Sequence, residues 1–326
     1  MTCLQTIRAM STVDKYIQAA TRENTRRSYQ SDITHFEVSW GGFLPATADS
    51  IAKYLADHAE ALSIGTLRHR LAALARWHQD QGFVDPTKAP LVRNVLKGIG
   101  ELHQRHQNQV KPLQFEDLES LVDWLDGQLT TAITVSDRKT VLRHSRDKAL
   151  LLIGFWRAFR SDELCRLTVE RISVSPGKGM EIFVPRSKGD RNNLGRTYKA
   201  PALKRLCPVA AYLDWIHNSA ITQGSVFRSI NRWGHVSDEA LHVDSVVSIL
   251  RKLFNSAELP AARDYSSRSL RRGFATWAND SQWDVKTLME YVGWKDIKSA
   301  MRYIDAPDPF SQQRIESSME KRLNIK

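Results

Sequence analysis

A polar stretch without periodicity, residues 101–112 (ELHQRHQNQVKP), divides this chain of 326 residues. It carries no apolar stripe and ends in a proline, which is the composition of a linker. Domains usually hold roughly 100–200 residues, so the chain is long enough for two. We therefore expect a domain over residues 12–100, the linker, and a second domain over residues 113–304. Segments 1–11 and 305–326 are expected to be a flexible N-terminus and a C-terminal tail.

The first domain is predicted to be all α-helical, because its apolar residues recur at helical spacing. Ser63 is a suitable N-cap for its third helix. The face of that helix opposite the apolar one carries Arg68, Arg70 and Arg76. A basic stripe beside an apolar stripe suits a surface that packs on one side and faces phosphate on the other, although a solvated charged face has the same pattern.

The second domain is predicted to be mainly α-helical with one small antiparallel sheet. A buried helix is expected over residues 147–155, where the side chains are almost all apolar. After Leu167 the pattern changes to the alternation of strands separated by turn-forming residues. Three strands are expected, followed by helices to the end, and they cover residues 172–175, 180–184 and 196–200. The fold class is therefore α+β in this domain and all-α in the first.

Charge and cysteine usage limit the partners and the compartment. Lys and Arg number 47 against 36 Asp and Glu, a net charge of +11 that favours association with polyphosphate. The three cysteines have no metal-binding spacing, which favours a reducing compartment. The longest apolar run, residues 149–156, is too short for a membrane span, and the N-terminus lacks the apolar core of a signal peptide. A soluble intracellular protein without a membrane partner is expected.

The second domain contains the side chains that metal-free cleavage and rejoining of DNA would need. Arginines suit the clamping of an anionic phosphodiester, because their planar guanidinium groups stay charged and bind bidentately. A tyrosine can hold the phosphoryl group covalently, and a lysine or histidine can protonate the departing oxygen. The sequence has no HExxH motif, no paired cysteines and no phosphate-binding loop of the Gly-Lys-Ser/Thr type. In chain order the candidates are Arg160, Lys188, Arg268, Arg271, Trp294 and Tyr303.

Their order and context resemble the active site of the tyrosine recombinase (phage integrase) family. FRSDEL, with Arg160 and Glu163, is similar to the family's first motif, and RSLRRGFAT, with Arg271, is similar to its second. The resemblance implies that Arg160 and Arg271 clamp the phosphate, that Glu163 orients Arg160, and that Tyr303 is the nucleophile. Lys188, in the turn between the second and third strands, would protonate the leaving oxygen. Rival candidates are Arg157 for the first arginine, and Lys178 and Lys199 for the lysine.

One position departs from the family pattern. The residue three before the second arginine is usually histidine, and here it is Arg268. A histidine can exchange a proton near neutral pH, whereas an arginine cannot act as a base. Arg268 could still bind phosphate and lower the pKa of the tyrosine. Trp294 stands where the family has histidine or tryptophan, and its indole N–H can donate to a phosphate oxygen.

The resemblance extends to the first domain. NTRRSY, residues 24–29, and TLRHRL, residues 66–71, are similar to the core-binding domains of Cre-like recombinases. By this similarity and by the basic stripe of the third helix, the residues expected to contact DNA are Arg26, Arg27, Arg68, Arg70 and Arg76.

Taken together, the resemblance implies a site-specific recombinase. It would form a 3′-phosphotyrosine and exchange strands through a Holliday junction, without a metal or nucleotide cofactor. The working unit would be a homotetramer on two double-stranded DNA sites, with accessory proteins, in the cytoplasm at the nucleoid. One alternative is a DNA-binding protein of the same fold with weak or lost catalysis, which Arg268 in the usual histidine position favours. Another is a type IB topoisomerase-like or telomere-resolving activity. The tail after Tyr303 could dock on its own domain or on a neighbouring subunit.

Overall fold

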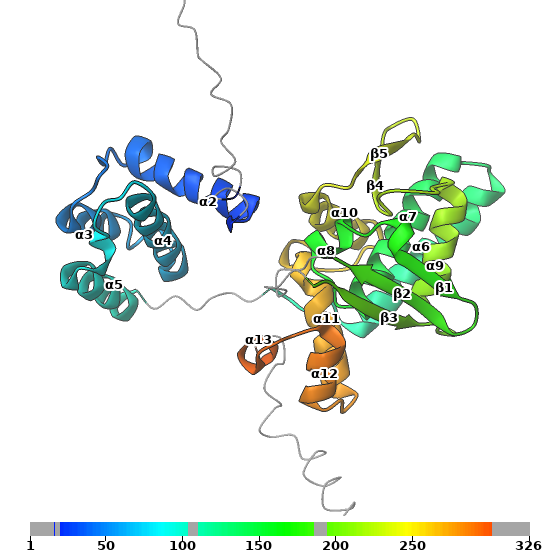
Figure 1. The fold of residues 1–326 in the computed structure, drawn as a ribbon. Coiled ribbons are helices and arrows are strands. Elements are labelled where there is room, and N and C mark those ends of the chain that lie inside the picture. The colour runs from blue at the N-terminus through cyan, green and yellow to red at the C-terminus, as the bar shows by residue number, and fades with distance from the viewer. Residues whose placement is uncertain (1–15, 17–19, 104–109, 186–193, 302–326) are drawn as a thin grey trace, which may run out of the picture. The chain divides into compact units, whose positions relative to one another are not determined.

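The computed structural model describes residues 16, 20–103, 110–185 and 194–301 (Figure 1). The chain forms two compact units, residues 1–108 and 109–326. The boundary between them falls inside the stretch expected to be a linker. No helix within the described residues is long and apolar enough to cross a membrane.

The first unit is a bundle of helices with its own apolar core. Its fully buried side chains include Phe36 on the π-helical turn, Ile51 and Tyr54 on the second helix, and Leu67 on the third. The elements, in order, are α2 (Glu23–Thr34), η1 (His35–Ser39), α3 (Ala48–Asp57), α4 (Ile64–Asp80), η2 (Pro86–Lys88) and α5 (Pro90–Leu102). The all-α prediction for this segment agrees with these elements.

Local sequence explains where these helices begin and end. The Ser63 hydroxyl accepts the backbone N–H of Thr66 at 3.1 Å, which confirms Ser63 as the N-cap of α4. Thr47 caps α3 in the same way through the N–H of Ser50. After η1 the chain turns at Gly42, where an added Cβ would lie 2.5 Å from the ring of Phe36. Only glycine lets the chain pass this close to the core.

The second unit contains most of the chain's secondary structure and a single large core. Its helices are α6 (Phe115–Thr134), α7 (Arg138–Trp156), α8 (Ser161–Cys165), α9 (Pro208–Ser219), α10 (Val243–Ser256), α11 (Ser267–Asp280), α12 (Val285–Val292) and α13 (Ile297–Met301), with the short 3₁₀ turns η3 (Val169–Arg171) and η4 (Ala262–Asp264). Its strands are β1 (Ile172–Ser175), β2 (Gly179–Val184), β3 (Arg196–Pro201), β4 (Arg228–Ile230) and β5 (Val236–Ala240).

Helix α7 is the central element of this core. Every residue from Ala149 to Phe155 is buried, as the apolar run predicts. The helix packs against α6, α9 and α11, so it needs apolar side chains on all of its faces. Gly154 allows α11 to approach closely, since an added Cβ there would lie 2.7 Å from the side chain of Leu270.

The sheet β1–β2–β3 is antiparallel and confirms the three predicted strands. Its pairing runs from Gly179 opposite Pro201 at one end to Val184 opposite Arg196 at the other. One face of the sheet belongs to the core and contributes the buried side chains Met180, Ile182, Val184, Tyr198 and Ala200. The predicted fold class, mainly α with a small antiparallel sheet, is confirmed.

A second hairpin, β4–β5, shows that the prediction of helices alone after the sheet is wrong. Its strands are too short and too irregular to produce an alternating pattern, and their pairing shifts between Arg228 and Ile230. The turn depends on Asn231, whose side-chain oxygen accepts the backbone N–H groups of Trp233 and His235. Gly234 follows with a φ of +88°. An asparagine and a glycine at these positions are the only local signal of this hairpin.

The end of the linker segment and the residue after it are bound to η4 and to the start of α11. The N–H of Lys111 donates to the carbonyl of Asp264 at 3.3 Å, and the N–H of Leu113 donates to that of Ser269 at 3.0 Å. Gly273 packs on the backbone of Leu113, where an added Cβ would lie 2.1 Å from the carbonyl oxygen. No side chain fits between α11 and this segment.

We expect Gly273→Ala to destabilise the second unit, because the new methyl group must push α11 away from Leu113. Overpacking of this kind costs about 1–3 kcal/mol. Gly127→Ala is the matched control: it lies in α6 with no atom within 4 Å of an added Cβ. Alanine there should raise stability by about 0.5–1 kcal/mol. Urea unfolding measures both, and equal midpoints for the two variants would contradict the close packing at Gly273.

Candidate active site

Arg160 and Glu163 are joined at the start of helix α8. One carboxylate oxygen of Glu163 accepts the backbone N–H of Arg160 at 2.9 Å, and the other accepts its guanidinium Nη1 at 2.7 Å. The Glu163 side chain is 3% exposed, whereas that of Arg160 is 34% exposed. The buried carboxylate therefore fixes both the backbone and the side chain of Arg160, while part of the guanidinium faces solvent. Donors held in this way suit the binding of an anion.

Arg271 reaches the same carboxylate from α11. Its side chain is 3% exposed, and its Nη1 lies 3.9 Å from Oε2 of Glu163. The same nitrogen donates a hydrogen bond of 2.8 Å to the backbone carbonyl of Ala158. Ala158 has a φ of +49°, and this left-handed turn between α7 and α8 places its carbonyl at Arg271. Glu163 thus lies between two arginines that are far apart in the sequence.

Trp294 packs against Arg271 from a third part of the chain. The Arg271 guanidinium carbon lies 5.1 Å from the centre of the Trp294 ring, and Trp294 is buried. Helix α12 ends at Val292, and Gly293 follows with a φ of +81° that reverses the chain and lets the N–H of Trp294 donate back to the carbonyl of Met289. A cation over an aromatic face is attracted by the ring electrons. The contact therefore fixes the position of Trp294 relative to the arginines.

Arg268 is exposed and lies one helical turn before Arg271. Residues three apart share one face of a helix, so both arginines belong to the same side of α11. Its backbone N–H is bound by the hydroxyl of the N-cap residue Ser266 at 3.1 Å. The side chain is thus available to solvent beside a site whose other arginine is buried.

Two predicted residues, Lys188 and Tyr303, lie outside the described residues. In sequence, Lys188 falls between β2 and β3, and Tyr303 comes two positions after the end of α13. Their roles stay predictions. The strands β2 and β3, which flank Lys188 in the sequence, and helix α13, which precedes Tyr303, belong to the unit that holds Arg160 and Arg271.

The two rival lysines occupy other places on the sheet. Lys178 lies in the turn that joins β1 to β2, at the opposite end of β2 from the β2–β3 connection. Lys199 pairs with Glu181 on the neighbouring strand, at 3.0 Å, and is exposed. Neither lysine shares a strand end with the β2–β3 connection, where Lys188 falls in the sequence.

The rival arginine, Arg157, points into the protein instead of toward an open site. It is 2% exposed and donates to the carbonyls of Lys199, at 3.0 Å, and Tyr291, at 2.6 Å. These bonds occupy both terminal nitrogens of the guanidinium, which leaves Arg160 as the arginine accessible to a ligand. Arg196, which no sequence motif singled out, binds the neighbouring carbonyl of Glu290. Nothing local in the sequence reveals such carbonyl partners.

Four of the five arginines predicted to contact DNA are exposed on the first unit. Arg26 and Arg27 lie on α2, where Arg27 pairs with Glu23 one turn earlier. Arg68 and Arg76 lie on α4, where Arg76 pairs with Asp80 at 2.8 Å. Exposed ion pairs are weak, so these side chains can exchange their partners for phosphate.

The fifth, Arg70, is turned into the bundle. Its side chain is 13% exposed, and its nearest carboxylate oxygen, on Asp32, lies 3.8 Å away. Nη1 donates to the hydroxyl of Tyr54 at 2.9 Å and lies 3.0 Å from Nδ1 of His35. Asp32 also binds His69 at 2.6 Å. These contacts join α2, α3 and α4, which favours a structural role for Arg70 over direct phosphate binding.

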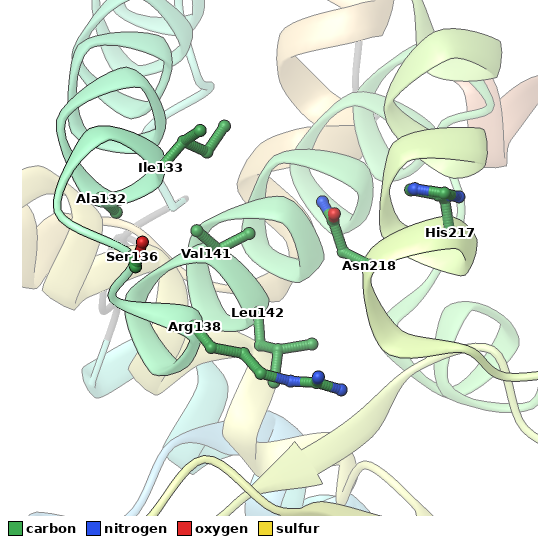
Figure 2. A pocket seen from close by; sticks show the side chains of 8 residues that line it. All are labelled: Ala132, Ile133, Ser136, Arg138, Val141, Leu142, His217 and Asn218. Atoms are coloured by element: carbon green, nitrogen blue, oxygen red, sulfur yellow. The ribbon is translucent and has the colours of Figure 1, made fainter.

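A shallow hollow in the second unit shares no residue with this site (Figure 2). It lies between the end of α6, the start of α7 and the end of α9, and its lining combines apolar side chains with a few polar ones. The residues around it are Ala132, Ile133, Ser136, Arg138, Val141, Leu142, His217 and Asn218.

Comparison with known proteins covers most of the chain. Residues 123–308 match the model of the phage integrase family. The chain is 29% identical over 315 residues to an "Integrase/recombinase xerD homolog" of Selenomonas ruminantium. That alignment covers 94% of this chain and 88% of the relative.

Solved structures share the fold at low sequence identity. The Tn1549 transposon integrase, in complex with transposon right end DNA, matches with a TM-score of 0.59 and 16% identity, covering 94% of this chain and 97% of that one. The XerH site-specific recombinase, bound to palindromic difH substrate in a post-cleavage complex, matches with a TM-score of 0.56 and 19% identity, covering 84% and 69%.

We expect the first unit to lose stability as the pH falls below about 6.5, the ordinary pKa of histidine. Burial, followed by the charges of Arg70 and His58, lowers the pKa of His35, while Asp32 opposes this shift. The unfolded chain therefore takes up the proton first, so stability present above pH 6.5 is lost as the pH falls toward the lower folded pKa. Hydrogen exchange of the α2–α4 amides, corrected for the intrinsic effect of pH, measures this loss.

The matched variants are His35→Gln, which should reduce the acid-dependent loss, and His103→Gln at the end of α5, which should keep it. An unchanged pH dependence in His35→Gln would show that another group is responsible.

Proposed function

Because this chain belongs to the phage integrase family, we propose that it is a site-specific DNA recombinase that cuts and rejoins strands through a covalent 3′-phosphotyrosine. The observation that supports this function best is the buried carboxylate of Glu163, which lies between Arg160 and Arg271. The guanidinium groups of Arg160 and Arg271, both beside Glu163, form a site for an anionic group. The scissile phosphate of DNA is such a group.

In the proposed reaction, the hydroxyl of Tyr303 loses its proton to solvent water as its oxygen attacks the scissile phosphorus and the bond to the 5′ oxygen breaks. Arg160 and Arg271 stabilise the charge that gathers on the non-bridging oxygens. Lys188 gives a proton to the departing 5′ oxygen, and Trp294 donates its indole N–H to the phosphate. The energy of the broken bond is kept in the phosphotyrosine, so rejoining needs no nucleotide cofactor. A 5′ hydroxyl from a partner strand then reverses the step.

The net positive charge of the site suits the anionic transition state of phosphoryl transfer more than it suits a neutral ligand. Two arginines and one glutamate leave a net positive charge around Glu163. Arg271 is held by the Ala158 carbonyl and Arg160 by the carboxylate, so little reorganisation is needed when charge develops. Arg268, exposed beside Arg271, adds positive charge that would favour the tyrosinate but cannot remove its proton.

The proposed partner is a double-stranded DNA site, bound by the exposed arginines of the first unit and by the arginines of the second. By analogy with the family, a homotetramer on two sites would exchange strands through a Holliday junction, with accessory proteins, at the nucleoid. The tail beyond Tyr303 would dock either on its own unit or on a neighbouring subunit. The net charge of +11 supports association with DNA.

A protein that binds DNA with weak catalysis is the second candidate. Arg268, in place of the usual histidine, favours this alternative because the path of the tyrosine proton then lacks its usual base. Restoring the histidine with Arg268→His distinguishes the two, since only a catalytically competent site would respond with faster cleavage.

We expect Tyr303→Phe to abolish a protein–DNA adduct that survives denaturant, because phenylalanine has no oxygen to bond to phosphorus. The substrate is a duplex from the sequence that flanks the gene, nicked near the point of exchange so that the cut strand diffuses away. Adduct in the wild type alone would establish tyrosine chemistry. Tight, salt-sensitive binding without adduct in the wild type would favour the DNA-binding alternative.

We expect Glu163→Gln to slow adduct formation by about 10- to 100-fold while DNA binding changes by less than about threefold. The amide keeps the shape of the carboxylate but no longer attracts both guanidinium groups. Asp162→Asn is the control, because Asp162 lies on the same helix and pairs with Arg166 at the surface. Equal rates for the two variants would show that Glu163 does not organise the arginines.

A further inference from the structure

We propose that Arg157 and Arg196 form a positioning pair that fixes Trp294 and α13, the segment leading to Tyr303, against the sheet. We call these two residues the arginine pair. The proposal rests on the proposed function, because it assigns the pair to the placement of the nucleophile segment. It assigns the two arginines to backbone carbonyls and not to the phosphate.

Arg157 connects three pieces of the second unit. It lies between the end of α7 and Arg160, and it donates to the carbonyl of Lys199 on β3 and to that of Tyr291 on α12. Its guanidinium carbon also lies 3.9 Å from the ring centre of Tyr291 and 5.1 Å from that of Tyr198. Carbonyl oxygens and ring faces therefore surround the cation.

Arg196 makes the matching contact from the start of β3. Its Nη2 donates to the carbonyl of Glu290, one residue before Tyr291. Its guanidinium carbon lies 5.2 Å from the ring centre of Tyr198, and the guanidinium of Arg157 lies against the same ring. Two adjacent carbonyls of α12 thus accept hydrogen bonds from two arginines, and both arginines contact the ring of Tyr198.

These carbonyls lie where a helix most needs donors. The last four carbonyls of a helix have no partner within it, and the helix dipole places negative charge at this end. Glu290 and Tyr291 belong to the last turn of α12, which ends at Val292. Guanidinium groups at this position both satisfy the carbonyls and complement the dipole.

The turn after α12 is bound to the same group of side chains. An added Cβ on Gly293 would lie 3.0 Å from Nη1 of Arg196 and 3.1 Å from the hydroxyl of Tyr198. Gly293 also has the positive φ that reverses the chain toward Trp294. The chain thus leaves α12 close against Arg196 and Tyr198, and the next residue, Trp294, lies against Arg271.

Packing alone would not require a charged side chain at position 157. Among the described residues, no carboxylate forms an ion pair with Arg157, and burial lowers the pKa of its guanidinium. A buried cation without a counterion costs more than a well-packed apolar side chain. The guanidinium of Arg157 provides two hydrogen-bond donors, and these join α12 to β3 at a fixed distance.

The first test measures hydrogen exchange in the full chain. Arg157→Met keeps a long apolar side chain but removes both donors, so amides of residues 290–301 should exchange at least about tenfold faster, while those of α9 stay unchanged. Arg157→Lys, with one charged group instead of a fork, should give an intermediate change. The matched control is Arg205→Met, a surface arginine of the same unit that pairs with Glu119 at 3.0 Å.

The second test measures adduct formation on the nicked substrate. We expect Arg157→Met to form adduct about 10- to 100-fold more slowly, with the DNA dissociation constant within about twofold of wild type. A substrate with a 5′-bridging sulfur separates the two ends of the reaction, because a thiolate leaves without a proton donor. The variant should stay slow on this substrate, since its defect lies in the nucleophile segment and not in Lys188.

Unchanged exchange over residues 290–301, or full recovery of the rate on the sulfur substrate, would overturn the proposal. If Arg157→Met does not fold, Arg196→Gln removes the exposed member of the pair, and the same exchange pattern is expected from it. A wild type that forms no adduct would refute the proposed function alone, because the exchange measurement still decides whether the pair holds α12.

Discussion

The candidate active site depends on one buried carboxylate. Glu163 binds the backbone and side chain of Arg160 and lies 3.9 Å from a nitrogen of Arg271. Without a negative charge between them, two guanidinium groups that lie 2.7 and 3.9 Å from one carboxylate would repel each other. Because the carboxylate is almost fully buried, its attraction for both is little weakened by water. The corner between α7 and α8 therefore brings together two cations from distant parts of the sequence.

Backbone carbonyls also hold arginines of the second unit in place. Arg271 donates to Ala158, and Arg157 donates to Lys199 and Tyr291. Each bond joins segments that are separate in the sequence: α11 to the α7–α8 corner, and that corner to β3 and α12. Hydrogen bonds from a charged donor are stronger than neutral ones, so a few of them suffice to hold the segments in register. The same type of side chain thus serves two purposes in one unit, with Arg160 facing solvent and Arg157 facing the interior.

The two units use arginine differently. On the first, exposed arginines along α2 and α4 suit the non-specific attraction of a DNA backbone, while Arg70 holds helices together through Tyr54 and Asp32. On the second, the arginines are placed individually by partners that leave little freedom. Affinity needs only charge near the phosphates, whereas catalysis needs donors at fixed positions.

The local features could be predicted from the sequence: the helix cap at Ser63, the buried run of α7, the three strands of the first sheet and the order of the candidate motifs. These depend on periodicity and on residues a few positions apart. The sequence did not determine the β4–β5 hairpin, whose strands are too short to alternate, nor which of Arg157 and Arg160 is accessible. The fold settles which arginine is accessible, because the carbonyls of Lys199 and Tyr291, far away in the sequence, turn Arg157 inward, while the nearby Glu163 holds Arg160 at the surface.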